Sequence, residues 1–88
     1  MKSYEIVFSK VAAKDLRHLP NDVIKRVIAK ARELRDVPRP PGCKRLVGEK
    51  EDLWRVRIGN YRIIYTIEDS ICIIDIRRIG HRRNIYNK

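Results

Sequence analysis

Three arginines just past the middle of the chain are spaced so that they could share one anion. The stretch WRVRIGNYRIIY, residues 54–65, alternates apolar and cationic residues on both sides of Gly59-Asn60. A two-residue connection with Gly first fits a tight β-hairpin turn, which pairs Arg57 with Arg62 and puts Arg55 one step along on the same face. Directly opposed like charges destabilise a sheet by up to about 1 kcal/mol. A bound anion would offset this repulsion, and the guanidinium fork suits phosphate.

More cations follow at the end of the last strand-like segment. They could surround a groove at one edge of the sheet, and they are Arg77, Arg78, Arg82 and Arg83. A turn at Glu68-Asp69 would put Asp75 beside Arg62, where the carboxylate could orient the guanidinium. The alternative interpretation is that the strand arginines are ordinary outward-facing residues, some of them satisfied by Asp75 or Glu68.

Few side chains are suited to proton transfer. His18 falls at the end of the first expected helix, where a surface or capping role is predicted. His81 differs because it lies among arginines beside Tyr86, and neighbouring positive charge favours the neutral imidazole that can accept a proton. The sequence has no Gly-rich phosphate loop, no Ser/His/Asp order and no CxxC. Cys43 and Cys72 are therefore expected to be free thiols, and no metal site is predicted.

Two amphipathic helices are expected near the start of the chain. Residues 4–8 form a β-prone run, and Ser9 offers an N-cap for a helix that ends before Pro20. A second helix is predicted from Asn21 onward. Its apolar face follows the helical repeat and consists of Ile24, Val27, Ile28, Ala31 and Leu34.

The rest of the chain is strand-like after the Pro- and Gly-rich residues 38–42, which cannot continue a helix. A short strand is expected from Lys44, and longer ones at 53–58, 61–67 and 71–79. The order β-α-α-β-β-β-β predicts a single α+β domain over residues 1–88. In this fold a helical hairpin packs on one face of a twisted antiparallel sheet, and the three arginines lie on the open face.

The net charge points to a polyanionic partner. The 88 residues carry a formal charge of +10. Residues 1–43 hold ten Lys and Arg against five acids, and residues 44–88 hold eleven against six, so each half carries +5. Nucleic acid is the default partner of such a surface, and a merely solvated basic surface is the alternative. Because no apolar run could span a bilayer and no signal-peptide pattern is present, a cytoplasmic protein without a membrane partner is expected.

Taken together, the motifs resemble the RelE/ParE toxin superfamily. They are the order Y-x-I-x-F-S, a helical hairpin, K-x-L-x-G, R-V-R-x-G-x-Y-R-x-x-Y and a terminal G-H-R-R-x-x-Y. The similarity covers almost the whole chain, and its carriers are Tyr4, Ile6, Phe8, Ser9, Lys44, Leu46, Gly48, Arg55, Val56, Arg57, Gly59, Tyr61, Arg62, Tyr65, Gly80, His81, Arg82, Arg83 and Tyr86.

The resemblance implies a small α+β toxin that is encoded with an antitoxin. In this superfamily the RelE branch cuts messenger RNA in the ribosomal A site, whereas the ParE branch poisons DNA gyrase and usually lacks the cationic catalytic set. The arginines and the tail tyrosine make this chain look like the RelE branch, and a gyrase inhibitor without nuclease activity is the alternative. The implied partners are a RelB-like antitoxin, the ribosome with its rRNA, and mRNA. The toxin alone is expected to be a monomer, and its complex with the antitoxin to be of higher order.

The resemblance also assigns catalytic positions. Arg55 and Arg57 match the two basic positions of the strand before the turn, and Arg62 matches the arginine of the G-x-Y-R motif. Arg82 and Tyr86 match the tail arginine and tyrosine. Further RNA contacts are expected at Lys44, Arg45, Arg77, Arg78 and Arg83, the last being also a rival for the tail arginine. The implied reaction is attack of a ribose 2′-OH on the adjacent phosphate, without metal or cofactor.

One departure from the best-known RelE pattern concerns the base. That pattern has lysines where this chain has Arg55 and Arg57, and an arginine does not lose its proton in proteins. We therefore expect the arginines to bind and stabilise the phosphate, and either His81 or Tyr86 to handle the proton. Tyr86 could also stack on a base.

Overall fold

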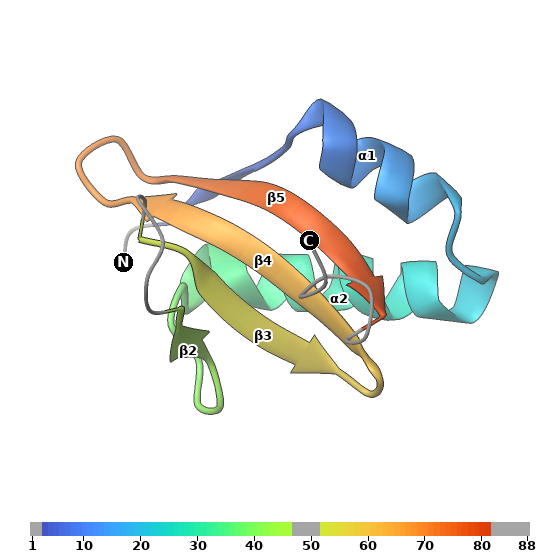
Figure 1. Cartoon of the computed structure of the whole chain (residues 1–88). Helices are drawn as coiled ribbons and strands as arrows, with labels where there is room; N and C mark the ends of the chain where they lie inside the picture. The colour runs from blue at the N-terminus through green and yellow to red at the C-terminus, as the bar shows by residue number, and fades with distance from the viewer. Residues whose placement is uncertain (1–2, 47–51, 82–88) are drawn as a thin grey trace.

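A computed structural model describes residues 3–46 and 52–81 and shows two helices and five strands (Figure 1). In chain order the elements are β1 (Glu5–Phe8), α1 (Lys10–Arg17), α2 (Asn21–Asp36), β2 (Lys44–Arg45), β3 (Trp54–Ile58), β4 (Tyr61–Glu68) and β5 (Ile73–His81). This is the predicted α+β order.

The five strands form one sheet in the order β1-β5-β4-β3-β2. Strands β2 to β5 pair antiparallel with their neighbours, as predicted, but β1 pairs parallel with β5. The sheet is therefore mixed rather than wholly antiparallel. Parallel strands need a long connection between them. The two helices and strands β2 to β4 provide it between β1 and β5.

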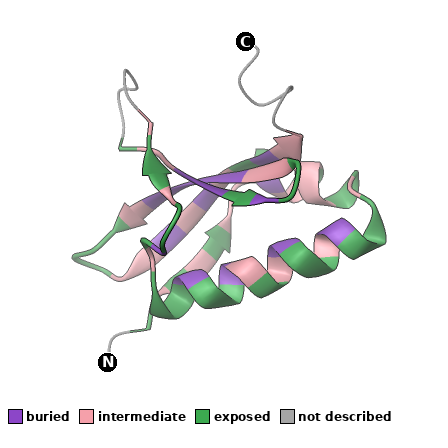
Figure 2. Cartoon of the chain, turned by 90° about the horizontal axis from the view of Figure 1, so that it is seen from below, coloured by how far each residue is buried: buried purple, intermediate pink, exposed green. Residues whose placement is uncertain are grey.

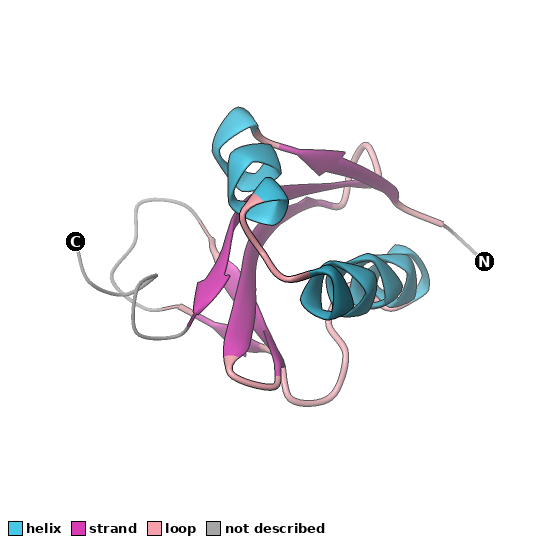
Figure 3. Ribbon diagram, turned by 90° about the vertical axis from the view of Figure 1, so that its right-hand side faces the viewer, coloured by secondary structure: helices cyan, strands magenta, loops and turns pink. Residues whose placement is uncertain are grey.

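Both helices lie on the same side of the sheet (Figure 3). Ser9 caps α1, because its Oγ accepts the Ala12 N–H at 3.0 Å. The buried positions of α2 recur at helical spacing, and they are Val23, Val27, Ala31 and Leu34. Figure 2 shows the buried parts of this helix on its side toward the sheet. The predicted stripe is thus rotated slightly, since Ile24 and Ile28 are only half-buried. No helix in the described part of the chain is long and apolar enough to cross a membrane.

The β3–β4 hairpin has the predicted register, with Arg57 opposite Arg62 and Trp54 opposite Tyr65. Its turn depends on Gly59, whose φ of +58° suits the first central position of a type II′ turn. A Cβ at this position would lie 2.9 Å from the guanidinium of Arg26 on α2. The turn thus lies beside the end of the flexible Arg26 side chain, and the positive φ is the stronger reason for Gly at this position.

The linker between α2 and β2 contacts the end of the sheet where β3 begins and β4 ends. The buried Tyr65 hydroxyl donates to the Pro38 carbonyl at 2.8 Å. Arg39 lies over the Trp54 ring, 5.0 Å from its centroid, and donates to Asp69 at 3.0 Å. That hydrogen bond raises the pKa of Arg39. These contacts set where β2 begins beside β3.

Candidate functional site

The arginines of the β3–β4 hairpin lie as the sequence predicts in register, but they differ in exposure. Arg57 is exposed and its partner Arg62 is half-buried, whereas only 5% of Arg55 is exposed. Placement on the open face of the sheet therefore does not make Arg55 accessible. It lies where β3 is flanked on both sides, by Lys44 of β2 and by Ile64 of β4, while β2 does not reach as far as Arg57.

A cleft of about 300 Å³ brings several of these cations together at the β2–β3 edge. Its residues come from α2, the linker, β2 and β3, and they are Lys30, Pro41, Gly42, Lys44, Arg55, Val56 and Arg57. All four charged residues of this lining are cations. Lys30 is balanced by Glu33 at 3.1 Å. A concave surface with charge of one sign concentrates counter-ions, so the cleft is suited to an anion.

Arg45, the second residue of β2, is a weaker candidate for contacting an anion. Its guanidinium pairs with Asp52 at 3.0 Å, and both side chains are largely exposed. An exposed pair of this kind contributes little to stability and is easily exchanged for another anion. Arg45 therefore extends the basic edge without adding to the cleft.

The predicted contact between Asp75 and Arg62 is wrong. The β4–β5 connection comprises residues 69–72 instead of a tight turn at Glu68-Asp69, and this shifts the register. Arg62 consequently pairs with Gly80, and Asp75 pairs with Thr66, four positions along β4. Asp75 lies 4.0 Å from Arg77 instead.

The two arginines of β5 have different surroundings from the hairpin arginines. Arg77 is the extra residue of a β-bulge, since Ile64 pairs with Arg78 and Tyr65 with Ile76. The Arg78 guanidinium donates to Asp15 of α1 at 2.9 Å. Sequence reasoning missed Asp15, although an acid inside a basic helix opposite an arginine-rich strand was an available signal.

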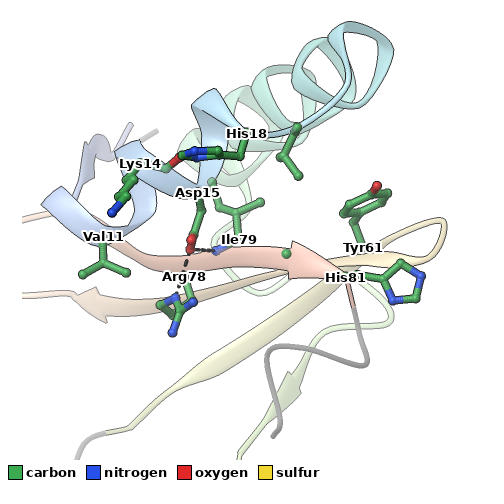
Figure 4. Close-up of a pocket in the computed structure, with 10 residues that line it drawn as sticks. Val11, Lys14, Asp15, His18, Tyr61, Arg78, Ile79 and His81 are labelled. Carbon is green, nitrogen blue, oxygen red and sulfur yellow. Dashed lines mark hydrogen bonds and ion pairs between the residues drawn. The ribbon is translucent and has the colours of Figure 1, made fainter. Parts of the chain in front are cut away.

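His81 lies at the end of β5, opposite Tyr61, and the two rings meet edge to face with centroids 5.6 Å apart. Both side chains line a cleft of about 610 Å³ between α1 and β5 (Figure 4). His18, the C-cap of α1, lines it too, and its Nδ1 lies 2.8 Å from the Lys14 carbonyl, so the predicted capping position is confirmed.

Strand alternation assigns these residues to opposite faces of the sheet. Since Gly80 pairs with Arg62 and His81 with Tyr61, His81 is on the face of Tyr61 and the arginines are on the other. Tyr61, Ile79 and His81 thus line the cleft of about 610 Å³ from the face opposite to Arg57 and Arg62, while Arg78 and Gly80 line it at the edge of β5. Arg82, Arg83 and Tyr86, the predicted tail residues, lie outside the described residues.

Within residues 3–46 and 52–81, no three His, Cys, Asp or Glu residues are grouped so as to hold a metal ion. Both cysteines, Cys43 and Cys72, are free thiols, as predicted. The four cations that line the β2–β3 cleft supply fixed positive charge, which can bind an anion such as phosphate.

The sequence is similar to that of known toxins over most of its length. Residues 6–86 match the family described as the ParE toxin of the type II toxin–antitoxin system parDE. Toxin RelG of Mycobacterium tuberculosis is 32% identical over 87 residues, covering 97% of this chain and 98% of that protein.

Solved structures show the same fold. The toxin–antitoxin complex RelBE2 of M. tuberculosis contains a chain that is 31% identical, with a TM-score of 0.81, and the match covers 91% of this chain and 99% of that one. The archaeal RelE–RelB complex of Pyrococcus horikoshii matches at 28% identity with a TM-score of 0.80, covering 93% and 98%. With its fold, its motifs and the family match over residues 6–86, the chain belongs to the RelE/ParE superfamily of type II toxin–antitoxin toxins.

Proposed function

We propose that this toxin is an mRNA endonuclease that acts in the ribosomal A site and thereby inhibits translation. The observation that carries the proposal is the direct opposition of Arg57 and Arg62 on the open face of the sheet, next to the cleft that Lys44 and Arg55 line. Like charges at directly paired positions of a sheet repel each other, and a bound phosphodiester would reduce that repulsion. The name of the relative RelG supports the same branch.

The proposed reaction is an intramolecular transesterification of the RNA. A ribose 2′ oxygen forms a bond to the adjacent phosphorus while the bond from phosphorus to the 5′ oxygen breaks. The 2′ hydroxyl gives its proton to a base, and the leaving 5′ oxygen takes one from an acid. The products are a 2′,3′-cyclic phosphate and a 5′-OH end. Arg57, Arg62 and the tail residue Arg82 would stabilise the charge that builds up on the phosphoryl oxygens.

Proton transfer is proposed for the tail. Of the two candidates, His81 shares a face with Tyr61, away from Arg57 and Arg62, whereas Tyr86 lies outside the described residues. We therefore favour Tyr86 as the group that exchanges a proton with the RNA. The wider contacts to rRNA and mRNA are proposed for Lys44, Arg45, Arg77, Arg78 and Arg83.

The test is cleavage of mRNA on programmed ribosomes, with the 5′ ends mapped by primer extension. We expect cuts at the A-site codon only when ribosomes are present, and Arg57→Ala should lower kcat by about 100-fold because one transition-state donor is lost. Arg32→Ala is the matched control, since Arg32 is an exposed arginine of α2. Equal cutting of free mRNA would contradict the A-site proposal.

A second candidate function is inhibition of DNA gyrase without nuclease activity. The observation in its favour is that the matching family model describes the ParE toxin of parDE systems. It predicts no mRNA cuts in the ribosome assay and inhibition of gyrase supercoiling by the purified toxin. A gyrase-specific effect that survives Arg57→Ala would replace the nuclease proposal.

A further inference from the structure

The β-bulge in β5 decides which residues face Arg62. Before the bulge Tyr65 pairs with Ile76, and after it Ile63, Arg62 and Tyr61 pair with Ile79, Gly80 and His81. Each inserted residue exchanges the two faces of the strand beyond it. Without the bulge, Ile79 would face Arg62 and Arg78 would enter the core. With it, Ile79 is buried in the core, and Gly80, which has no side chain, lies opposite Arg62.

Strand β1 is shorter than β5, so the bulge in β5 has no strand neighbour on that edge. Ser9 and helix α1 make hydrogen bonds to β5 there instead. The last β1 pairing joins Phe8 to Ile76, so the following part of β5 lacks a strand neighbour there. Ser9 continues the ladder, because its N–H donates to the Ile76 carbonyl at 3.0 Å and its Oγ donates to the Arg77 carbonyl at 3.1 Å. The start of α1 thus substitutes for the missing strand.

About one and a half helical turns after Ser9, Asp15 also makes hydrogen bonds to the edge of β5 that β1 leaves unpaired (Figure 4). Its Oδ2 accepts the Ile79 N–H at 3.0 Å and the Arg78 Nε at 2.9 Å. Only 19% of its side chain is exposed, so this carboxylate is largely removed from water. Hydrogen bonds from a backbone amide and a guanidinium to an ionised carboxylate are short and strong. They fix the two residues that come directly after the bulge.

We propose that Asp15 is a positioning residue for RNA cleavage. It acts through β5 and not on the substrate: it holds the strand so that Gly80 leaves space beside Arg62 and so that the chain enters the tail from a fixed point. Arg82 and Tyr86 follow that point within five residues of His81. This inference rests on the proposed nuclease function, because the geometry matters to the reaction only if the tail and Arg62 act together.

The first part of the test measures positioning without measuring cleavage. In Asp15→Ala, native-state hydrogen exchange should accelerate by at least about tenfold at the Ile79 and Gly80 amides, while Ile63 and Tyr65 of β4 keep their protection. Asp36→Ala is the control, because it removes the same charge from an exposed site at the end of α2. Unchanged exchange at Ile79, or faster exchange over the whole sheet, would overturn the proposal.

The second part measures cleavage kinetics on programmed ribosomes. Asp15→Ala should lower kcat by about 10- to 100-fold with KM changed less than about twofold, because misplacement affects the transition state more than binding. Asp15→Asn keeps an acceptor for the Ile79 N–H and should restore both exchange protection and most of kcat. If Asp15→Ala does not fold, Asp15→Asn can be compared directly with the wild type in both measurements. An Asn variant with normal protection but the low kcat of the Ala variant would overturn the positioning role.

The two proposals fail in different ways. A wild-type protein that does not cut mRNA, while Ile79 loses protection in Asp15→Ala, contradicts the nuclease function and leaves the structural role of Asp15 intact. A wild-type protein that cuts, with an Asp15→Ala variant that cuts as fast as Asp36→Ala, contradicts the positioning role alone.

Discussion

Arg57 of β3 and Arg62 of β4 lie directly opposite each other, at a position where opposite charges would be favourable and like charges are not. At this spacing two guanidinium groups repel by up to about 1 kcal/mol, and the net charge of +10 adds to that repulsion. Apolar packing on the opposite face offsets this repulsion, because the neighbouring pair Val56 and Ile63 is buried in the core. One face of this hairpin thus supplies apolar packing, while the other brings two guanidinium groups to directly opposed positions.

The tail residues carry the first prediction at this scale. Tyr86→Phe keeps the aromatic ring but removes the hydroxyl, so the cleavage rate should fall by about 100-fold or more if that hydroxyl exchanges a proton with the RNA. His81→Ala should stay within about threefold of wild type from about pH 5.5 to about pH 8, because His81 faces away from the arginines. Single-turnover rates on programmed ribosomes measure both. The reverse pattern, a large loss only in His81→Ala, would assign the proton to the histidine.

At the scale of elements, local sequence patterns predicted the pairing of two strands correctly where a tight turn joins them. The Gly59-Asn60 turn and the alternation of residues 54–65 predicted the β3–β4 register correctly. The pairing of β4 with β5 could not be predicted in the same way, because the loop at 69–72 has no strong turn signal and the bulge at Arg77 depends on contacts from α1. Hence the sequence misplaced Asp75 and gave no role to Asp15.

Tertiary contacts also explain the other differences. The parallel pairing of β1 follows from how the helical hairpin packs, which no local pattern encodes. The burial of Arg55 follows from its pairing with Lys44 of β2; the short strand is expected from the sequence, but two residues are too few to predict its partner or register. The cationic composition of the site was thus predictable, whereas the division of its residues between two faces of the sheet required the three-dimensional register.

The linker between α2 and β2 provides a prediction about stability. Tyr65→Phe removes the hydroxyl that donates to the Pro38 carbonyl and should lower the free energy of unfolding by about 1 kcal/mol at neutral pH. Burial raises the pKa of Tyr65 well above its usual value near 10. The folded state therefore favours the neutral phenol, and the contribution of Tyr65 is fully present below about pH 10 and declines as the pH rises further.

Urea unfolding at a series of pH values measures this effect. Each pH unit above about 10 costs the wild type about 1.4 kcal/mol relative to the Phe variant, so its advantage should vanish by about pH 11. Taking the difference between the two proteins cancels the titration of the other tyrosines and lysines. A difference that stays constant up to about pH 11 would mean that Tyr65 ionises as easily in the folded state as in the unfolded one.

At the scale of the whole molecule, positive charge is spread over both layers. The exposed cations include Lys25, Arg26, Arg32 and Arg35 on α2, Lys10, Lys14 and Arg17 on α1, and Arg57 on the sheet. Each half of the chain carries a charge of +5, so no single tail or helix accounts for the total. Such a surface attracts a polyanion from many directions, and under the proposed function the arginines of the sheet would then select one orientation.

If the charge of +10 supplies most of the attraction, the affinity of the toxin for ribosomes should depend strongly on salt. With two to five phosphate contacts, affinity for programmed ribosomes should fall by about 10- to 500-fold between about 50 and about 200 mM monovalent salt. Replacing Arg57 with Ala should lower the slope of log affinity against log salt by about one unit, since one phosphate contact is lost. Equilibrium titrations with a labelled toxin give both slopes. An affinity that does not depend on salt would mean that apolar contacts, and not the +10 surface, hold the toxin on its target.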